Sequence, residues 1–343
     1  MTYARKLRIN GLILLFAVFV HHCFGSTKTT SSSSPHSEQD KKKILKVKII
    51  QSATHIALDK TRQGIIASLI KGGYIEGQSL HIVTESAQGN PALSSQIASK
   101  FTSQEPDLIF TLGTLSTLSF LKAVHEDKAK VIFVSVTDPM SSKIVDNLTC
   151  RSHQVSGVSN FVDIKPQIDM IREIQPTMTK LGIIYNPIEI NSVHVVELLR
   201  KVCKEMNISL KEQTVTRTSE LPQASSSLVG QVDAIYIGND NTALSGFKSI
   251  VNSALKKGIP VYSSDVDQVK EGALAAKGPN QFSIGVQAAE MAVRHLKGSK
   301  LSEIAIEYPN VTEIHINMIM AQALDLKIKD SLLLSSKVIR TLS

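Results

Sequence analysis

The chain has 343 residues, of which 42% are hydrophobic and 20% are charged. This length predicts about two domains, and the composition is that of a soluble globular protein, which excludes collagen-like, disordered and multi-span membrane classes. Lys and Arg exceed Asp and Glu by 38 to 30, but part of the surplus lies near the N-terminus and the chain has no Trp, so nucleic-acid binding is not expected.

Residues 1–25 have the pattern of a secretory signal peptide. Basic residues at positions 5–8 precede the apolar run 11–20, which is too short to span about 30 Å of hydrocarbon as a helix. Two alternatives stay open, an uncleaved anchor and a lipoprotein signal in which Cys23 becomes acylated. Residues 26–45 are rich in Ser, Thr and charge and are expected to form a flexible tether. The sequence thus predicts an exported protein, periplasmic or attached to the outer face of the cytoplasmic membrane.

The rest of the chain alternates between short β-branched runs and longer amphipathic stretches, which is typical of βα units and a parallel sheet. Strands are expected at 47–51, 81–84, 107–113, 131–136, 181–185, 209–215, 233–238 and 259–263. Helices are expected at 59–71, 94–103, 114–122, 164–174, 192–206, 242–257 and 283–296.

The two halves of this region repeat the same order of strand, polar loop and helix. The first half contains VKIIQSATHIALD, DLIFTLGTLST and KVIFVSVTDP, and the second contains LGIIYNPIEINS, DAIYIGNDNTA and GIPVYSSDVD in the corresponding places. The matching order favours an α/β fold of two similar, doubly wound parallel-sheet lobes over one long sheet. Ligands on such sheets bind outside the carboxyl ends of the strands, so two facing rims predict a cleft that holds a small ligand.

The loops at these strand ends are polar and supply the candidate ligand-binding residues. They are His55, Thr114, Thr137 and Asp138 in the first half, and Glu189, Asn191, Ser192, Asp240 and Asp265 in the second half. Helix N-termini at Thr114 and Ser192 would attract the negative end of a ligand. A second interpretation stays open for Ser192, Asp240 and Asp265, because Ser and Asp are also strong helix N-caps. Because Trp is absent, only Phe and Tyr could stack on an aromatic ligand.

Other kinds of site find little support in the sequence. The ten His residues lack the paired spacing of a zinc site, and no Gly-x-Ser-x-Gly or GxxxxGK[ST] motif is present, so no metal, cofactor or enzymatic activity is expected. Beyond the signal, Cys150 and Cys203 either form one bridge or remain two separate thiols, of which the separate thiols are favoured.

Long stretches in matching order resemble the family of ABC transporter substrate-binding proteins that includes tryptophan and tyrosine uptake components. The resemblance covers nearly the whole mature chain and rests on stretches such as ALDKTRQGIIASLIKGGYIEGQSL, VIFVSVTDPM, VSGVSNFVDIKPQIDMI and IPVYSSDVDQVKEGALAAKG. It implies a type I periplasmic binding protein fold with three crossovers between the lobes. The implied lobes are 46–157 with 279–308, and 158–278 with 309–343.

The resemblance also implies positions in the cleft and a function. By position, Asn191, Ser192, Asp240 and Asp265 lie on one rim, and Thr114, Thr137 and Asp138 lie on the other. Where relatives have Pro after the His of the first loop, this chain has Ile56, which leaves the role of His55 open. The implied function is to bind a hydrophobic or aromatic amino acid and deliver it to an ABC permease with its ATPase. The alternative is a sensor that uses the same clamp to signal to a membrane partner.

Overall fold

The computed structural model describes residues 44–124, 130–146 and 155–340. The predicted signal peptide, nearly all of the predicted tether and Cys150 lie outside these residues. Within the described part of the chain, no helix is both long and apolar enough to cross a membrane.

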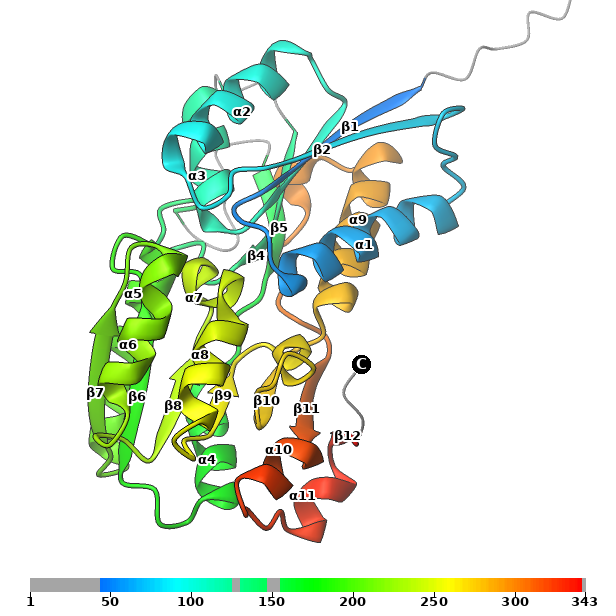
Figure 1. Cartoon of the computed structure of the whole chain (residues 1–343). Helices are drawn as coiled ribbons and strands as arrows, with labels where there is room; N and C mark the ends of the chain where they lie inside the picture. Colours follow the sequence, from blue (N-terminus) through cyan, green and yellow to red (C-terminus); the bar gives the residue numbers. More distant parts are fainter. Residues whose placement is uncertain (1–43, 125–129, 147–154, 341–343) are drawn as a thin grey trace, which may run out of the picture. The chain divides into compact units, whose positions relative to one another are not determined.

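The first sheet has five parallel strands in the order β2-β1-β3-β4-β5. They are β1 Leu45–Gln51, β2 Leu80–Ser86, β3 Leu108–Leu112, β4 Val131–Val136 and β5 Val155–Ser159. Every residue of β3 and β4 is buried, because helices cover both faces of the sheet. These helices are α1 Ile56–Lys71, α2 Pro91–Ser103, α3 Thr114–Ala123 and α9 Gln281–Leu296. One core cluster joins the strands to α1 and α9, and another joins them to α2 and α3 (Figure 1).

The second sheet has seven strands in the order β12-β11-β10-β9-β8-β6-β7. They are β6 Lys180–Tyr185, β7 Ser209–Thr214, β8 Ala234–Ile237, β9 Val261–Ser263, β10 Ala275–Pro279, β11 Thr312–Asn317 and β12 Lys337–Ile339. The associated helices are α4 Ile164–Ile174, α5 Ile190–Glu205, α6 Leu221–Leu228, α7 Asn241–Ser245, α8 Phe247–Leu255, α10 Met318–Ala323 and α11 Asp330–Leu334, with short 3₁₀ turns η1 Thr218–Glu220, η2 Val266–Val269 and η3 Leu301–Glu303.

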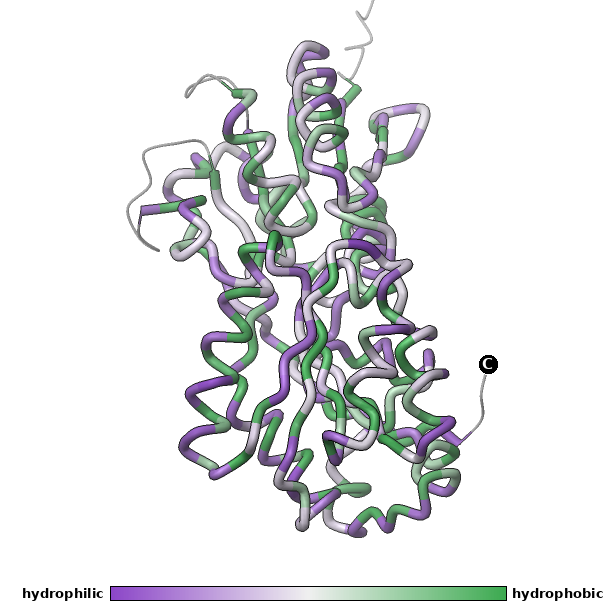
Figure 2. The backbone as a smooth tube through the Cα atoms, turned by 60° about the vertical axis from the view of Figure 1, so that its left-hand side comes forward, coloured by the Kyte–Doolittle hydropathy of each residue, from purple (hydrophilic) through white to green (hydrophobic). Residues whose placement is uncertain are grey.

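These helices bury one side each, as α4 shows with buried Ile164, Ile168, Ile171 and Ile174 at helical spacing. Figure 2 shows the same amphipathic pattern as green and purple stretches that alternate within the helical turns.

The chain passes between the two sheets three times. It leaves the first sheet after β5, returns after β10 to form α9 against α1, and leaves again after Glu307, which bridges to Val158 of β5. The two helices touch at Gly64 and Gly285, where a Cβ atom would collide with the backbone oxygen of Phe282 or Thr61, respectively. Glycine at these two positions therefore lets α9, which is distant in sequence, complete the first lobe.

The sequence pattern did not predict β5 of the first sheet, nor β10, β11 and β12 of the second sheet. Strand β11 pairs antiparallel with β10, whereas all the other pairs of this sheet are parallel. The chain leaves β10 for the first lobe and comes back from that same side, so β11 must run in the opposite direction. The expected helix 242–257 is divided into α7 and α8 at Gly246, whose backbone angles of φ −114° and ψ 22° are not helical.

Candidate functional site

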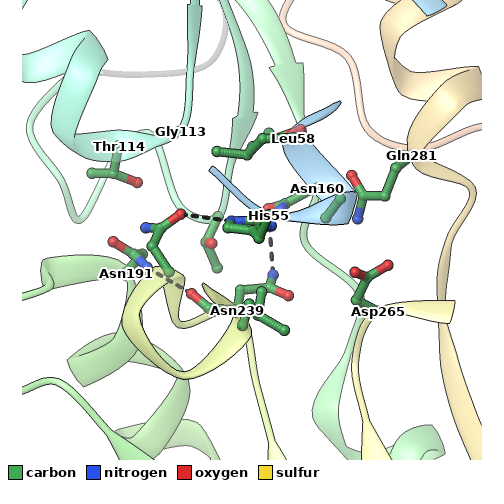
Figure 3. A pocket seen from close by; sticks show the side chains of 14 residues that line it. His55, Leu58, Gly113, Thr114, Asn160, Asn191, Asn239, Asp265 and Gln281 are labelled. Carbon is green, nitrogen blue, oxygen red and sulfur yellow. Dashed lines mark hydrogen bonds between the residues drawn. The ribbon is translucent and has the colours of Figure 1, made fainter. Parts of the chain in front are cut away.

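A pocket of about 380 Å³, partly open to solvent, lies where the carboxyl ends of strands from both sheets meet. Fourteen residues line it, and Figure 3 shows them. From the elements of the first lobe they are His55, Ala57, Leu58, Gly113, Thr114, Ser135, Thr137 and Gln281; Asn160 follows β5; from the second lobe they are Asn191, Asn239, Asn241, Leu244 and Asp265.

His55, in the loop between β1 and α1, is 8% exposed and contacts the other lobe. Its Nε2 lies 3.2 Å from Oδ1 of Asn241, while Nδ2 of Asn241 donates to Glu189 at 2.7 Å. Because the Asn241 oxygen must accept, Nε2 of His55 carries the proton and Nδ1 is an acceptor. Burial lowers the pKa of His55, which favours this neutral form. The Nδ1 atom is buried in the pocket without a hydrogen-bond partner.

Thr114 is the first residue of α3 and is 3% exposed, and its Oγ1 has no hydrogen-bond partner. Gly113 before it has a φ of 92°, and a Cβ atom there would lie 2.6 Å from Oγ of Ser52. That Ser52 hydroxyl accepts from the backbone N–H of Ser116 at 3.0 Å. Glycine therefore allows the turn that packs the first turn of α3 against β1 and aims it at the pocket.

Asp265 is the only carboxylate among the fourteen lining residues, and no Lys or Arg is among them. It is 1% exposed and accepts hydrogen bonds from Asp267 N at 3.2 Å and from Gln268 Nε2 at 3.3 Å. Burial, together with the charge of Asp267, raises the pKa of Asp265 to about 7. Burial therefore disfavours the charged form of Asp265, and none of the residues that line the pocket supplies a positive charge to offset it.

Two more predicted residues line the pocket. Asn191, in the first turn of α5, donates to the backbone oxygen of Asn239 at 2.6 Å. Thr137 follows β4 and is 3% exposed. Five of the nine sequence candidates, His55, Thr114, Thr137, Asn191 and Asp265, therefore come together around one pocket.

The other four candidates do not line the pocket and have other partners. Asp240 accepts from Asn186 N at 2.7 Å and Ala243 N at 2.6 Å, which makes it the N-cap of α7. Ser192 is 2% exposed and hydrogen-bonds to Asp240. Burial and the charge of Glu189 raise the pKa of Asp240 to about 7.

Glu189 and Asp138 also have partners within the protein instead of lining the pocket. The Glu189 carboxylate accepts from the backbone and side chains of Asn241 and Thr242 at 2.7 to 3.0 Å, which fixes the first turn of α7, where Asn241 contacts His55. Asp138 accepts from the N–H groups of Met140 and Ser141, and its Oδ2 lies 3.2 Å from Nε2 of His194 in the other lobe. The lobes thus contact each other beside the pocket as well as in it.

The sequence interpretation missed several lining residues. Asn239 and Asn241 flank Asp240 in a loop already recognised as polar, so a local signal existed for them. Asn160 and Gln281 lie at crossovers between the lobes, and only the three-dimensional path of the chain brings them to the pocket.

Neither a metal cluster nor a disulfide is found in the part of the chain that the structure describes. No group of three or more His, Cys, Asp or Glu residues there could hold a metal ion. Cys203 is a buried free thiol, and Cys150, its possible partner, lies outside the described residues.

Comparisons with known proteins agree with this geometry. The model of the family described as ABC transporter substrate binding protein matches residues 46–339. The chain is 32% identical over 322 residues to a tyrosine-binding protein of Clostridioides difficile (strain R20291), which covers 93% of each chain.

Two solved structures are also similar. An ABC domain in complex with L-Trp from Streptococcus pneumonia has a TM-score of 0.82 at 27% identity, covering 86% of this chain and 100% of that one. A ligand-free, open substrate binding protein from Clostridium difficile has a TM-score of 0.66 at 30% identity, covering 87% and 100%. The structure is thus more similar to the complex, in accord with the contacts between its lobes.

The two α/β lobes and three crossovers have the type I periplasmic binding protein fold. With the family match over residues 46–339 and the relative at 32% identity, they show that the chain belongs to the ABC transporter substrate binding proteins, which bind solutes and are not enzymes.

Proposed function

We propose that this chain is the extracytoplasmic solute-binding component of an ABC importer, and that it holds an aromatic amino acid between its lobes. The observation that carries the proposal is the distribution of charge and unpartnered atoms in the pocket. One wall has the buried Asp265 carboxylate, and the other walls have neutral groups, two of which, Thr114 Oγ1 and His55 Nδ1, lack partners.

A free amino acid complements this arrangement. Its ammonium group would pair with Asp265, since a charged donor offsets the cost of burying that carboxylate. Its carboxylate would accept from the Thr114 hydroxyl and from the first-turn amides of α3, where the helix dipole favours an anion. Because Asp265 and Thr114 belong to different lobes, a ligand that contacts both would favour the closed arrangement of the lobes.

The aromatic class is inferred from the relatives. The similar protein from Clostridioides difficile is named for tyrosine, and the similar solved domain contains L-Trp. Delivery to a permease with its ATPase is inferred from the family. Export is inferred from the signal-peptide pattern of residues 1–25.

Thermal unfolding of the chain with each of the twenty amino acids tests the binding proposal. A ligand that binds only the folded state at one hundred times its Kd should add about 2.7 kcal/mol to the free energy of unfolding and raise Tm. We expect L-Trp, L-Tyr or L-Phe to raise Tm most. If no aromatic amino acid raises Tm, the proposed ligand class is wrong.

Delivery needs a separate experiment, namely uptake of the radiolabelled ligand by cells with and without this chain. Loss of uptake is expected in its absence. Tight binding with unchanged uptake would contradict the importer function and favour the sensor.

A further inference from the structure

The two lobes meet at an ion pair that lies outside the pocket. Oδ2 of Asp138, in the loop after β4, is 3.2 Å from Nε2 of His194 on α5 of the other lobe. The side chains are partly buried, with 23% of His194 and 27% of Asp138 exposed, and neither lines the pocket. Because its two members belong to different lobes, this contact is made only while the lobes are together.

Each member of the pair is positioned by its own surroundings. Oδ1 of Asp138 accepts from the N–H groups of Met140 at 2.9 Å and Ser141 at 3.0 Å, which turns Oδ2 toward His194. The ring of His194 packs against the ring of Phe161, with centroids 6.3 Å apart. Burial opposes the charge of Asp138, but the hydrogen bonds from Ser141 and Met140 and the nearby His194 outweigh it and hold the pKa of Asp138 below its ordinary value. The Asp138 side is therefore charged at neutral and mildly acidic pH.

Other charged groups near the pair do not replace Asp138 as the partner of His194. On α4 and β7, which pack against α5, charged side chains have partners of their own: Lys165 pairs with Asp169 at 2.9 Å, and Glu212 pairs with Arg200 at 2.7 Å and accepts from Tyr185.

Glu197 lies three residues beyond His194 on the same helix and moves with it, so it does not distinguish separate lobes from joined ones. Tyr308, near Asp138, stays neutral because burial and the Asp138 charge raise its pKa.

Histidine is the side chain that ordinarily gains its charge between about pH 8 and pH 5. We propose that Asp138 and His194 form a latch between the lobes that tightens in acid, because protonation of His194 favours the closed arrangement. A neutral imidazole shares one hydrogen bond with the carboxylate, whereas an imidazolium adds the attraction of opposite charges. The closed arrangement brings the carboxylate to the imidazole and so binds the proton more tightly than the open one. By linkage, a fall in pH then shifts the population toward closure.

The latch is connected to the pocket through the chain. Thr137, the residue before Asp138, lines the pocket from the first lobe, and Asn191, one turn before His194 on α5, lines it from the second. A movement that brings these two walls together also brings the ion pair together. The latch therefore goes beyond the proposed function, since it acts on closure whatever solute the pocket holds.

The first test is calorimetric titration of the full chain, at pH 6 and pH 8, with the amino acid that raises Tm most. Asp265 and His55 are the same in wild type and variant, so the ratio of the two Kd values at each pH isolates the latch. His194→Gln should weaken binding about two- to fivefold at pH 6, as for a partly exposed ion pair, and less than twofold at pH 8. His81→Gln is the matched control, because His81 pairs with Glu76 at 3.8 Å within the first lobe. It should leave Kd unchanged at both pH values.

A double-mutant cycle and a ligand-free measurement complete the test. Asp138→Asn keeps an oxygen for the Met140 and Ser141 N–H groups, and it should reproduce the loss at pH 6 without adding to that of His194→Gln. Small-angle X-ray scattering without ligand should give the wild type a smaller radius of gyration at pH 6 than at pH 8, and His194→Gln the same value at both. Equal Kd ratios at the two pH values would refute the latch and leave amino-acid binding intact. If no amino acid binds, the proposed ligand class falls, and a wild-type radius that does not change with pH would then refute the latch as well.

Discussion

Replacing Asp265 by Asn should weaken ligand binding and stabilise the empty protein. The substitution removes the charge that we assign to the ligand ammonium, and hydrogen bonds to charged groups contribute about 1.5–3 kcal/mol, which corresponds to an increase in Kd of about 13- to 160-fold. The local structure should tolerate the change. Asn can still accept from Asp267 N, and its new Nδ2 can donate to the oxygen of a flipped Gln268 amide, an atom that has no partner in the wild type.

The gain in stability follows from the raised pKa of Asp265. A carboxyl group with a pKa of about 7 in the folded protein, against about 3.8 when unfolded, destabilises the folded state once it is charged. The contribution of Asp265 to folded stability is therefore most favourable at low pH, falls as pH rises from about 4 to about 7, and is constant above that. The full effect is at most about 4 kcal/mol at pH 8, and Asp265→Asn should recover part of it at pH 8 and little of it at pH 4.

Urea unfolding at pH 4 and pH 8, combined with calorimetric titration at pH 8, measures both effects. Asp240→Asn is the control, because Asp240 is equally buried, also has a pKa of about 7 and does not line the pocket. It should leave the Kd of the folded protein nearly unchanged. The reasoning fails if Asp265→Asn binds the ligand as tightly as the wild type, since Asp265 would then be only the N-cap of η2.

Three other substitutions or reactions have definite expected outcomes. Thr114→Val removes a buried hydroxyl that has no partner, so Tm without ligand should stay the same or rise while Kd increases about 2- to 13-fold; equal Kd values would remove Thr114 from the site. Glu189→Ala should lower the free energy of unfolding by about 1–3 kcal/mol, because backbone donors of Asn241 and Thr242 lose their acceptor. Urea unfolding measures this, and an unaltered midpoint would contradict it. Burial raises the pKa of the Cys203 thiol to about 11, so little reactive thiolate forms in the folded protein. In a variant with Cys23 and Cys150 replaced by Ser, maleimide should therefore label Cys203 only after unfolding. Rapid labelling of the folded variant would show that this thiol is accessible.

The division into two α/β lobes could be predicted from the sequence because it depends on local patterns. Buried parallel strands such as β3 and β4 appear as continuous β-branched and aromatic runs, and the loops after them begin with polar residues. The rule that ligands bind at the carboxyl ends of strands then pointed to Thr114 and Asp265, which line the pocket.

Local pattern could not separate residues that face the pocket from those that hold its walls. Asp240 and Asp265 are both Asp residues after a strand, both begin a helical turn and both are buried. Their different surroundings arise because Asp240 accepts from the backbone of Asn186 in the neighbouring loop, whereas Asp265 lines the space between the lobes.

The sequence by itself determined the order of most strands and helices, though not β5, β10, β11 or β12, and the set of polar loops that could meet a ligand. The tertiary structure decided which of those loops face each other, because that depends on the three crossovers. They place α9 on the first lobe, turn β11 antiparallel to β10 and bring Asn160 and Gln281 to the pocket. Contacts between residues far apart in the chain, such as His55 with Asn241, depend on how the lobes pack, and hydrophobic periodicity carries no information about that packing.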